Sequence, residues 1–129
     1  MSLVRPIQAV GAVGGLETAS DAPSGQPVEL FEVLIDDVGG EAWLRFRFHA
    51  PQIARNGGSV SFAAAEGDFE YLCTHVALPY ATEHSLVADV VSISLLDQRV
   101  AFGAADESVT QFVDAFRVTS GACIWEEPW

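Results

Sequence analysis

The two cysteines are the residues whose chemistry the sequence constrains most. Cys73 and Cys123 lie 50 positions apart, far from the Cys-x-x-Cys spacing of redox dithiols, so a catalytic thiol pair is disfavoured. Both fall in predicted core elements, where a disulfide and two free buried thiols are each compatible with the pattern. A disulfide would close a loop of about 50 residues and stabilise the fold by roughly 4 kcal/mol.

Histidines and carboxylates offer a metal ion little. His75 follows Cys73 by two positions, a step of about 200° on a helix, so the two side chains point to opposite faces. The other possible ligands are His49, His84, Asp36, Asp37 and Glu41. A zinc site needs four nitrogen or sulfur ligands at short pair spacings, and an EF-hand loop needs regularly spaced acidic residues. We predict no metal site, with a weak site from His75, His84 and a carboxylate as the alternative.

Nucleophilic and nucleotide-binding motifs are missing. The run Gly58-Ser59-Val60-Ser61 is the nearest string to the Gly-x-Ser-x-Gly elbow of hydrolases, and it does not match. All six basic residues are arginines, which excludes lysine Schiff bases, pyridoxal-phosphate anchors and P-loops. We therefore predict no catalytic residue and no cofactor.

One strand carries a row of side chains suited to recognition. In residues 42–49, the apolar Leu44, Phe46 and Phe48 alternate with Trp43, Arg45, Arg47 and His49. Alternation places the second set together on the outer face of a half-buried strand. Arginines and indoles are favoured anchors for carboxylates, acidic peptides and partner domains. This row is our candidate recognition face, and a solvated face or one covered by the N-terminal arm is the alternative.

Charge and hydropathy limit the partners. The chain has 129 residues, 18 acidic and 6 basic, with a net charge of -12 and a pI near 4.3. Such a surface repels phosphate backbones and anionic lipid, so we predict no nucleic-acid partner. The mean hydropathy is high, at +0.26, but no apolar run reaches the roughly 18 residues of a membrane span. We predict no membrane insertion.

The elements that must position these residues follow from hydrophobic periodicity. Alternating apolar residues indicate strands, and steps of three and four indicate helices. We predict strands at residues 28–35, 42–49, 91–95, 100–102 and 122–125, and helices at residues 62–78 and 106–116. Tight turns join neighbouring strands as hairpins, which favours antiparallel pairing. The predicted fold is α+β, an antiparallel sheet built from two hairpins plus a C-terminal strand, with two helices packed on one face.

The N-terminal region differs in composition from the rest of the chain. Residues 1–26 are rich in glycine, alanine, serine and proline and show no sustained period, so we predict a flexible arm followed by a single α+β domain over residues 27–129. The opening Met1-Ser2-Leu3 resembles residues left by cloning, and we expect that a natural export signal was removed.

Four short motifs together resemble a known family. They are Tyr71-Leu72-Cys73, Ala77-Leu78-Pro79, Ser92-Ile93-Ser94-Leu95 and Gly121-Ala122-Cys123-Ile124-Trp125-Glu126. Over residues 27–127 the chain is similar to a small uncharacterised bacterial family of exported proteins, a domain of unknown function. The resemblance implies export and a paired Cys73 and Cys123, and it implies no activity.

Some members of that family carry an acetolactate synthase label. A thiamine-dependent synthase needs a chain several times longer with a motif for magnesium and diphosphate, and this chain has neither. The opening hairpin and the paired cysteines also fit the regulatory subunit of such an enzyme poorly. The label does not fit these residues.

The sequence favours a non-enzymatic interaction or binding domain, periplasmic or secreted, whose partner is a protein or a small ligand. A small-molecule-binding regulatory domain is the alternative, and a hydrolase that uses histidine and carboxylate side chains is the third. An enzyme should present a titratable group with a perturbed pKa in a cleft, whereas a binding module should present an apolar or arginine-lined groove.

Overall fold

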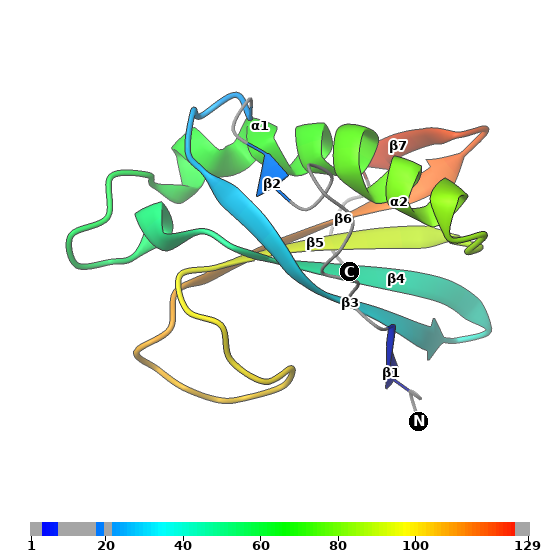
Figure 1. Ribbon diagram of the computed structural model, residues 1–129, viewed down its shortest axis with the longest axis horizontal. Coiled ribbons are helices and arrows are strands. Elements are labelled where there is room, and N and C mark those ends of the chain that lie inside the picture. Colours follow the sequence, from blue (N-terminus) through cyan, green and yellow to red (C-terminus); the bar gives the residue numbers. More distant parts are fainter. Residues whose placement is uncertain (1–3, 8–17, 20–21, 126–129) are drawn as a thin grey trace.

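The computed structural model describes residues 4–7, 18–19 and 22–125 (Figure 1). Its strands are β1 (Val4–Ile7), β2 (Thr18–Ala19), β3 (Val28–Val38), β4 (Glu41–His49), β5 (Val90–Leu96), β6 (Gln111–Thr119) and β7 (Ala122–Trp125). Its helical segments are η2 (Pro51–Ile53), α1 (Phe62–Leu72), η3 (Cys73–Ala77) and α2 (Leu78–Glu83). The strands form one sheet in the order β1-β3-β4-β5-β6-β7, and β2 also pairs with β3. The fold is α+β, with the long helix on one face of the sheet.

The first hairpin is where the sequence predicts it. β3 and β4 pair antiparallel, with Val38 opposite Glu41, so the connection is only two residues long. Gly39 and Gly40 have φ angles of 60° and 85°, a combination that a two-residue hairpin turn requires and that glycine adopts without strain.

The sheet is mixed, and the expectation of a wholly antiparallel sheet is wrong. β4 and β5 pair in parallel, with Phe46 opposite Ile93. The chain between these strands crosses the face of the sheet through α1, η3 and α2 (Figure 1), which is the kind of long connection that parallel pairing needs. Hairpin signals describe only the strands they join, so they left the relation between the two halves of the sheet undetermined.

The predicted second helix, residues 106–116, is also wrong. Residues 97–110 form a loop, and β6 follows it and pairs antiparallel with β5. The predicted strand at residues 100–102 belongs to this loop. The apolar residues Val109, Phe112, Val113 and Phe116 fit a helical stripe, but β-branched and aromatic residues favour a strand, and here the exposed edge of β5 selects the strand. The carboxylate of Asp106 accepts bonds from the Ser108 backbone and hydroxyl and thus forms a turn instead of a helix cap.

The first predicted helix is longer than expected. It begins after Ser61, whose Oγ accepts a hydrogen bond from the Ala64 amide at 3.2 Å, as an N-cap residue does. It continues past Pro79 to Glu83. Proline lacks an amide hydrogen and its ring crowds the preceding turn. The turn before it, η3, is π-helical, and the Leu78 amide bonds to the Cys73 carbonyl, so the widened turn accommodates Pro79.

The core lies between this helix and the sheet. Phe46 and Phe48 from β4 and Phe69 and Leu72 from α1 are fully buried, and the Tyr80 ring meets Phe46 edge-on at 5.6 Å. Cys73 and Cys123 form a disulfide that ties η3 to β7. Among the described ranges, no helix has both the length and the apolarity that crossing a bilayer requires.

A buried carboxylate holds the chain before β3 against the helix. Asp68 on α1 has no exposed surface and accepts bonds from the Ser24 amide at 2.9 Å, the Ser24 hydroxyl and the Gln26 side chain at 2.8 Å. Three donors offset the cost of burying the charge. β1 and β2 pair with the outer edge of β3. Residues 8–17 and 20–21 of the predicted arm lie outside the described residues, so its flexibility stays a prediction.

The disulfide yields the first testable prediction. A variant with Cys73→Ala and Cys123→Ala should unfold with a free energy about 4 kcal/mol lower than that of the oxidised protein, because its unfolded chain is no longer cross-linked across 50 residues. Urea unfolding measures the difference, and intact mass with thiol alkylation counts free cysteines. The reductant should destabilise the parent chain and leave the double variant unchanged. Alkylation of both cysteines in the native, unreduced protein would contradict the disulfide.

Candidate functional site

The four residues of the predicted recognition face lie on the side of the sheet away from the helix. Leu44, Phe46 and Phe48 point into the core between helix and sheet. Alternation therefore directs Trp43, Arg45, Arg47 and His49 to the opposite face. The face is covered there by the loop of residues 97–110, which curls beneath the sheet in yellow and orange in Figure 1.

Guanidinium groups and aromatic rings alternate along this face. The Arg45 guanidinium lies 5.1 Å from the Trp43 ring and 5.6 Å from the Phe102 ring. Arg47 lies 5.5 Å from the same Phe102 ring and 5.1 Å from Phe31. Arg99 lies 5.6 Å from Phe31. The resulting arginine–aromatic stack consists of Trp43, Arg45, Phe102, Arg47, Phe31 and Arg99, in that order. Each contact is within the range of a cation–π interaction.

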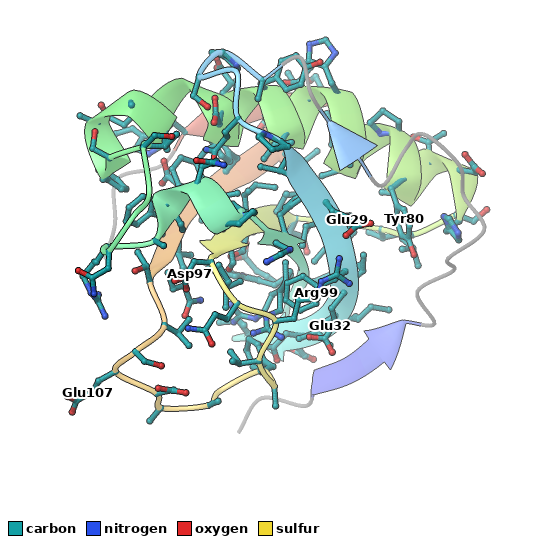
Figure 2. The ribbon with its side chains drawn as sticks, turned by 60° about the vertical axis from the view of Figure 1, so that its left-hand side comes forward. Glu29, Glu32, Tyr80, Asp97, Arg99 and Glu107 are labelled. Carbon is teal, nitrogen blue, oxygen red and sulfur yellow. A yellow bond between two sulfur atoms is a disulfide. The ribbon has the colours of Figure 1, made fainter. Side chains whose placement is uncertain are left out.

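Each arginine of the stack pairs with a carboxylate from β3. Asp36 binds Arg45 at 2.8 Å, Glu32 binds Arg47, and Glu29 binds Arg99. Figure 2 shows Arg99 reaching across from the loop to β3, where Glu29 and Glu32 lie. The stack is therefore neutral overall, and its arginines do not present three free positive charges to a ligand.

The burial of these pairs differs along the stack. The Arg47 side chain is 3% exposed, whereas that of Arg99 is 48% exposed. Asp36 is buried as well. Asp36 Oδ1 and Arg47 Nε have no hydrogen-bond partner among the described residues. Buried polar atoms are seldom left unpaired, so a water molecule or a ligand group that reached these two atoms would gain a hydrogen bond.

The loop over the stack is held at both its base and its tip. The Asp97 amide donates to the Thr110 carbonyl at 3.1 Å, and the Thr110 amide donates to Asp97 Oδ1 at 2.8 Å. His49 Nε2 donates to the Asp97 carbonyl at 3.2 Å. Near the tip, Phe102 rests on two arginines and is still 45% exposed. The loop is thus fixed in place with an aromatic side chain facing outward.

A separate ion pair lies at the other end of β4. Arg117 on β6 donates to both carboxylate oxygens of Glu41, at 2.7 and 3.2 Å. This hydrogen bonding lowers the pKa of Glu41 below its ordinary value. Desolvation opposes the shift, and the Arg117 charge and a hydrogen bond from the Trp43 side chain add to it.

The remaining candidate ligands do not converge. The His75 ring lies 4.5 Å from Tyr71, and the His84 ring stacks on Tyr80 at 4.0 Å. Across residues 4–7, 18–19 and 22–125, the structure contains no group of three or more histidine, cysteine, aspartate or glutamate side chains placed to hold a metal ion. These two histidines pack on aromatic neighbours of the same helix.

Sequence reasoning found four residues of this face and missed their partners. Phe102 was assigned to a strand, so nothing indicated that it would return over Arg45 and Arg47. Glu29, Glu32 and Asp36 could have been paired with arginines of the next strand from the hairpin register alone. The register shift between Leu30 and Glu32, which marks a β-bulge, could not be read from the sequence.

The comparison with protein families decides the kinship of the chain. The sequence matches the Family of unknown function (DUF6497) over residues 7–127. The chain belongs to DUF6497. This confirms the expected relation to a domain of unknown function. No curated protein and no solved structure matches the chain, so the function of this DUF6497 protein must be argued from its own geometry.

The unequal burial of the stack gives a prediction for two matched variants. Arg47→Met should lower the free energy of unfolding by about 2 kcal/mol, because it leaves Glu32 without its buried partner. Arg99→Met, at the exposed end, should lower it by less than about 0.5 kcal/mol. Urea unfolding followed by tryptophan fluorescence measures both. Equal losses would show that burial does not distinguish the pairs.

Glu41 gives a prediction for the dependence of stability on pH. A lowered pKa in the folded state means that Glu41 contributes stability above the ordinary glutamate pKa of about 4.3, and that this contribution disappears as pH falls through the lowered value. Glu41→Gln should therefore lose less stability than the parent between about pH 6 and pH 3. Glu66→Gln, at an exposed helix position, is the control and should follow the parent. Parallel curves for parent and Glu41→Gln would contradict the assignment.

Proposed function

We propose that this DUF6497 chain is a non-enzymatic binding domain of the periplasm or extracellular space, and that it contacts a partner protein through the loop of residues 97–110. The observation that carries the proposal is the seating of this loop on the arginine–aromatic stack, with Phe102 held at its tip and still 45% exposed.

The length and restraint of the loop support a binding role. Loops of about 12 to 15 residues without secondary structure are uncommon in compact domains and usually functional. This one is tied at its base through Asp97 and Thr110. Fixing a loop before binding removes an entropic cost from association. Aromatic and arginine side chains such as Phe102 and Arg99 are also the types enriched among residues that dominate binding energy.

The charge of the loop and of the whole chain indicates the character of the partner. Asp106 and Glu107 are exposed on the same loop as Phe102, and the net charge is -12. A complementary partner surface would present an apolar pocket for Phe102 and basic residues around it.

The disulfide supports export. Disulfides persist in oxidising compartments such as the periplasm and are rare in the cytosol, and Cys73 and Cys123 are joined here. The titratable groups favour binding over hydrolysis. Hydrogen-bond donors lower the pKa of Glu41 and that of Asp106, where the main donor is Ser108. A general acid needs a shift in the opposite direction.

The test is capture of a partner with and without Phe102. The oxidised chain and a Phe102→Ser variant are each exposed to periplasmic extract from the source organism, and any captured protein is purified and titrated by calorimetry. Removing a central aromatic anchor should weaken binding at least about tenfold. Val87→Ser is the matched control, because Val87 is 76% exposed but lies outside the loop. Equal affinities of parent and Phe102→Ser would refute the proposed surface.

A further inference from the structure

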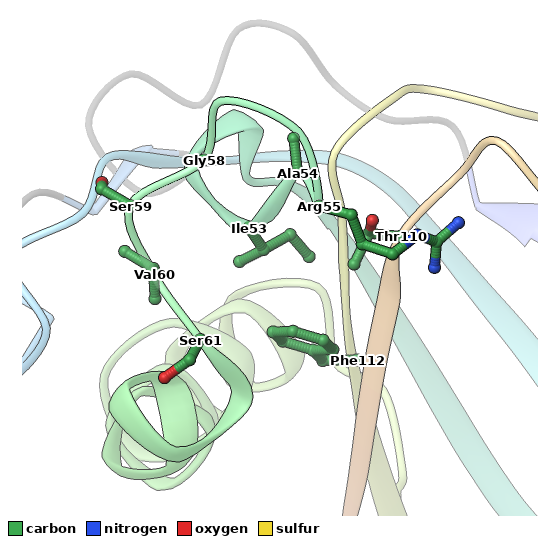
Figure 3. Close-up of a pocket in the computed structure, with 9 residues that line it drawn as sticks. All are labelled: Ile53, Ala54, Arg55, Gly58, Ser59, Val60, Ser61, Thr110 and Phe112. Atoms are coloured by element: carbon green, nitrogen blue, oxygen red, sulfur yellow. The ribbon is translucent and has the colours of Figure 1, made fainter.

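A pocket lies on the opposite side of the loop base from the arginine–aromatic stack. It has a volume of about 420 Å³, within the range of roughly 300 to 1,000 Å³ that small-molecule sites occupy. Figure 3 shows it between the segment that follows η2 and the start of β6. Its lining residues are Ile53, Ala54, Arg55, Gly58, Ser59, Val60, Ser61, Thr110 and Phe112.

The inner wall of this pocket is apolar. Ile53 is buried, and Val60 and Phe112 are packed against the main core. The Phe112 ring meets the Phe62 ring edge-on at 5.2 Å, and Phe62 is partly exposed. An apolar ligand body placed in the pocket would therefore contact a hydrophobic surface that continues outward to Phe62.

Arg55 supplies a positive charge beside this wall. Four other described arginines, Arg45, Arg47, Arg99 and Arg117, form ion pairs with carboxylates. Arg55 has no ion-pair partner within the described part of the chain, and it donates to the backbone carbonyl of Glu107. A guanidinium has five N–H donors, so this single bond leaves donors for a ligand anion. An unpaired cation is notable in a chain with 18 acidic residues.

Thr110 supplies a second, independent signal. It is 5% exposed, and its hydroxyl has no hydrogen-bond partner among the residues that the structure describes. Its backbone is fixed to Asp97. The neighbouring hydroxyls are occupied, since Ser59 donates to Gln52 at 2.8 Å and Ser61 caps α1. A buried hydroxyl without a partner costs free energy, which a ligand that bonds to it would recover.

We propose that this pocket binds a small monocarboxylic acid with an apolar body. The carboxylate would accept bonds from the Arg55 guanidinium and the Thr110 hydroxyl, and the apolar body would lie against Ile53, Val60 and Phe112. A single guanidinium matches one carboxylate, and the net charge of -12 disfavours a dianion.

This site is separate from the proposed partner surface. It uses Arg55 and the base of the loop at Thr110, whereas the partner surface uses Phe102 on the stack. A failed ligand titration would leave the Phe102 experiment intact, and the converse also holds.

Hexanoate is a suitable probe, with hexan-1-ol and hexylamine as matched ligands of equal chain length. Amide chemical shifts of the labelled, oxidised protein are followed by NMR during titration. Hexanoate should produce saturable shifts at residues 59–61 and at Thr110 and Phe112, with an affinity at least tenfold higher than that of either control. Equal affinities for the acid and the alcohol, or no saturable shifts for the acid, would overturn the proposal.

Two variants assign the polar contacts. Arg55→Met and the nearly isosteric Thr110→Val should each weaken hexanoate binding, Arg55→Met by at least tenfold. Arg99→Met, which alters another arginine near the same loop, should leave it unchanged. The amide spectrum of each free variant verifies that it is folded. Unchanged binding in both Arg55→Met and Thr110→Val would refute the assigned site.

Discussion

The burial of Arg47 in the outer face of the sheet is the constraint on which much of this structure depends. A guanidinium that is 3% exposed must have a counter-charge and neighbours that tolerate it. Glu32 on β3 supplies the charge, and the rings of Phe31 and Phe102 cover the two sides. Covering Arg47 brings the loop of residues 97–110 under the sheet, and that loop in turn helps to bury both faces of β5.

The helix side obeys a different constraint. The parallel pairing of β4 and β5 requires the chain to cross the sheet between them, and α1, η3 and α2 make that crossing. The disulfide from Cys73 to Cys123 then links the middle of the crossing to the last strand. Helix and sheet are thus joined covalently at a point where the π-helical turn already departs from regular geometry to accommodate Pro79.

These two constraints leave two surfaces with different chemistry. The stack is internally neutral, so its arginines position the loop and its exposed Phe102 more than they attract a charged ligand. Arg55 lies where β3 offers no carboxylate partner, beside an apolar wall. A partner protein at the first surface and a small acid at the second would therefore be recognised by different forces, apolar contact in one case and charge-assisted hydrogen bonding in the other.

The sequence by itself determined the first hairpin, the outward row on β4 and the α+β class, because alternation and glycine turn chemistry are local properties of the chain. It also raised the pairing of Cys73 with Cys123. Only the tertiary structure decided that residues 111–119 form a strand, since their apolar spacing suits a helix as well and the open edge of β5 made the choice. It alone placed Phe102 over Arg45 and Arg47 and gathered Arg55 with Thr110, because such contacts join residues more than 50 positions apart and leave no period in the sequence.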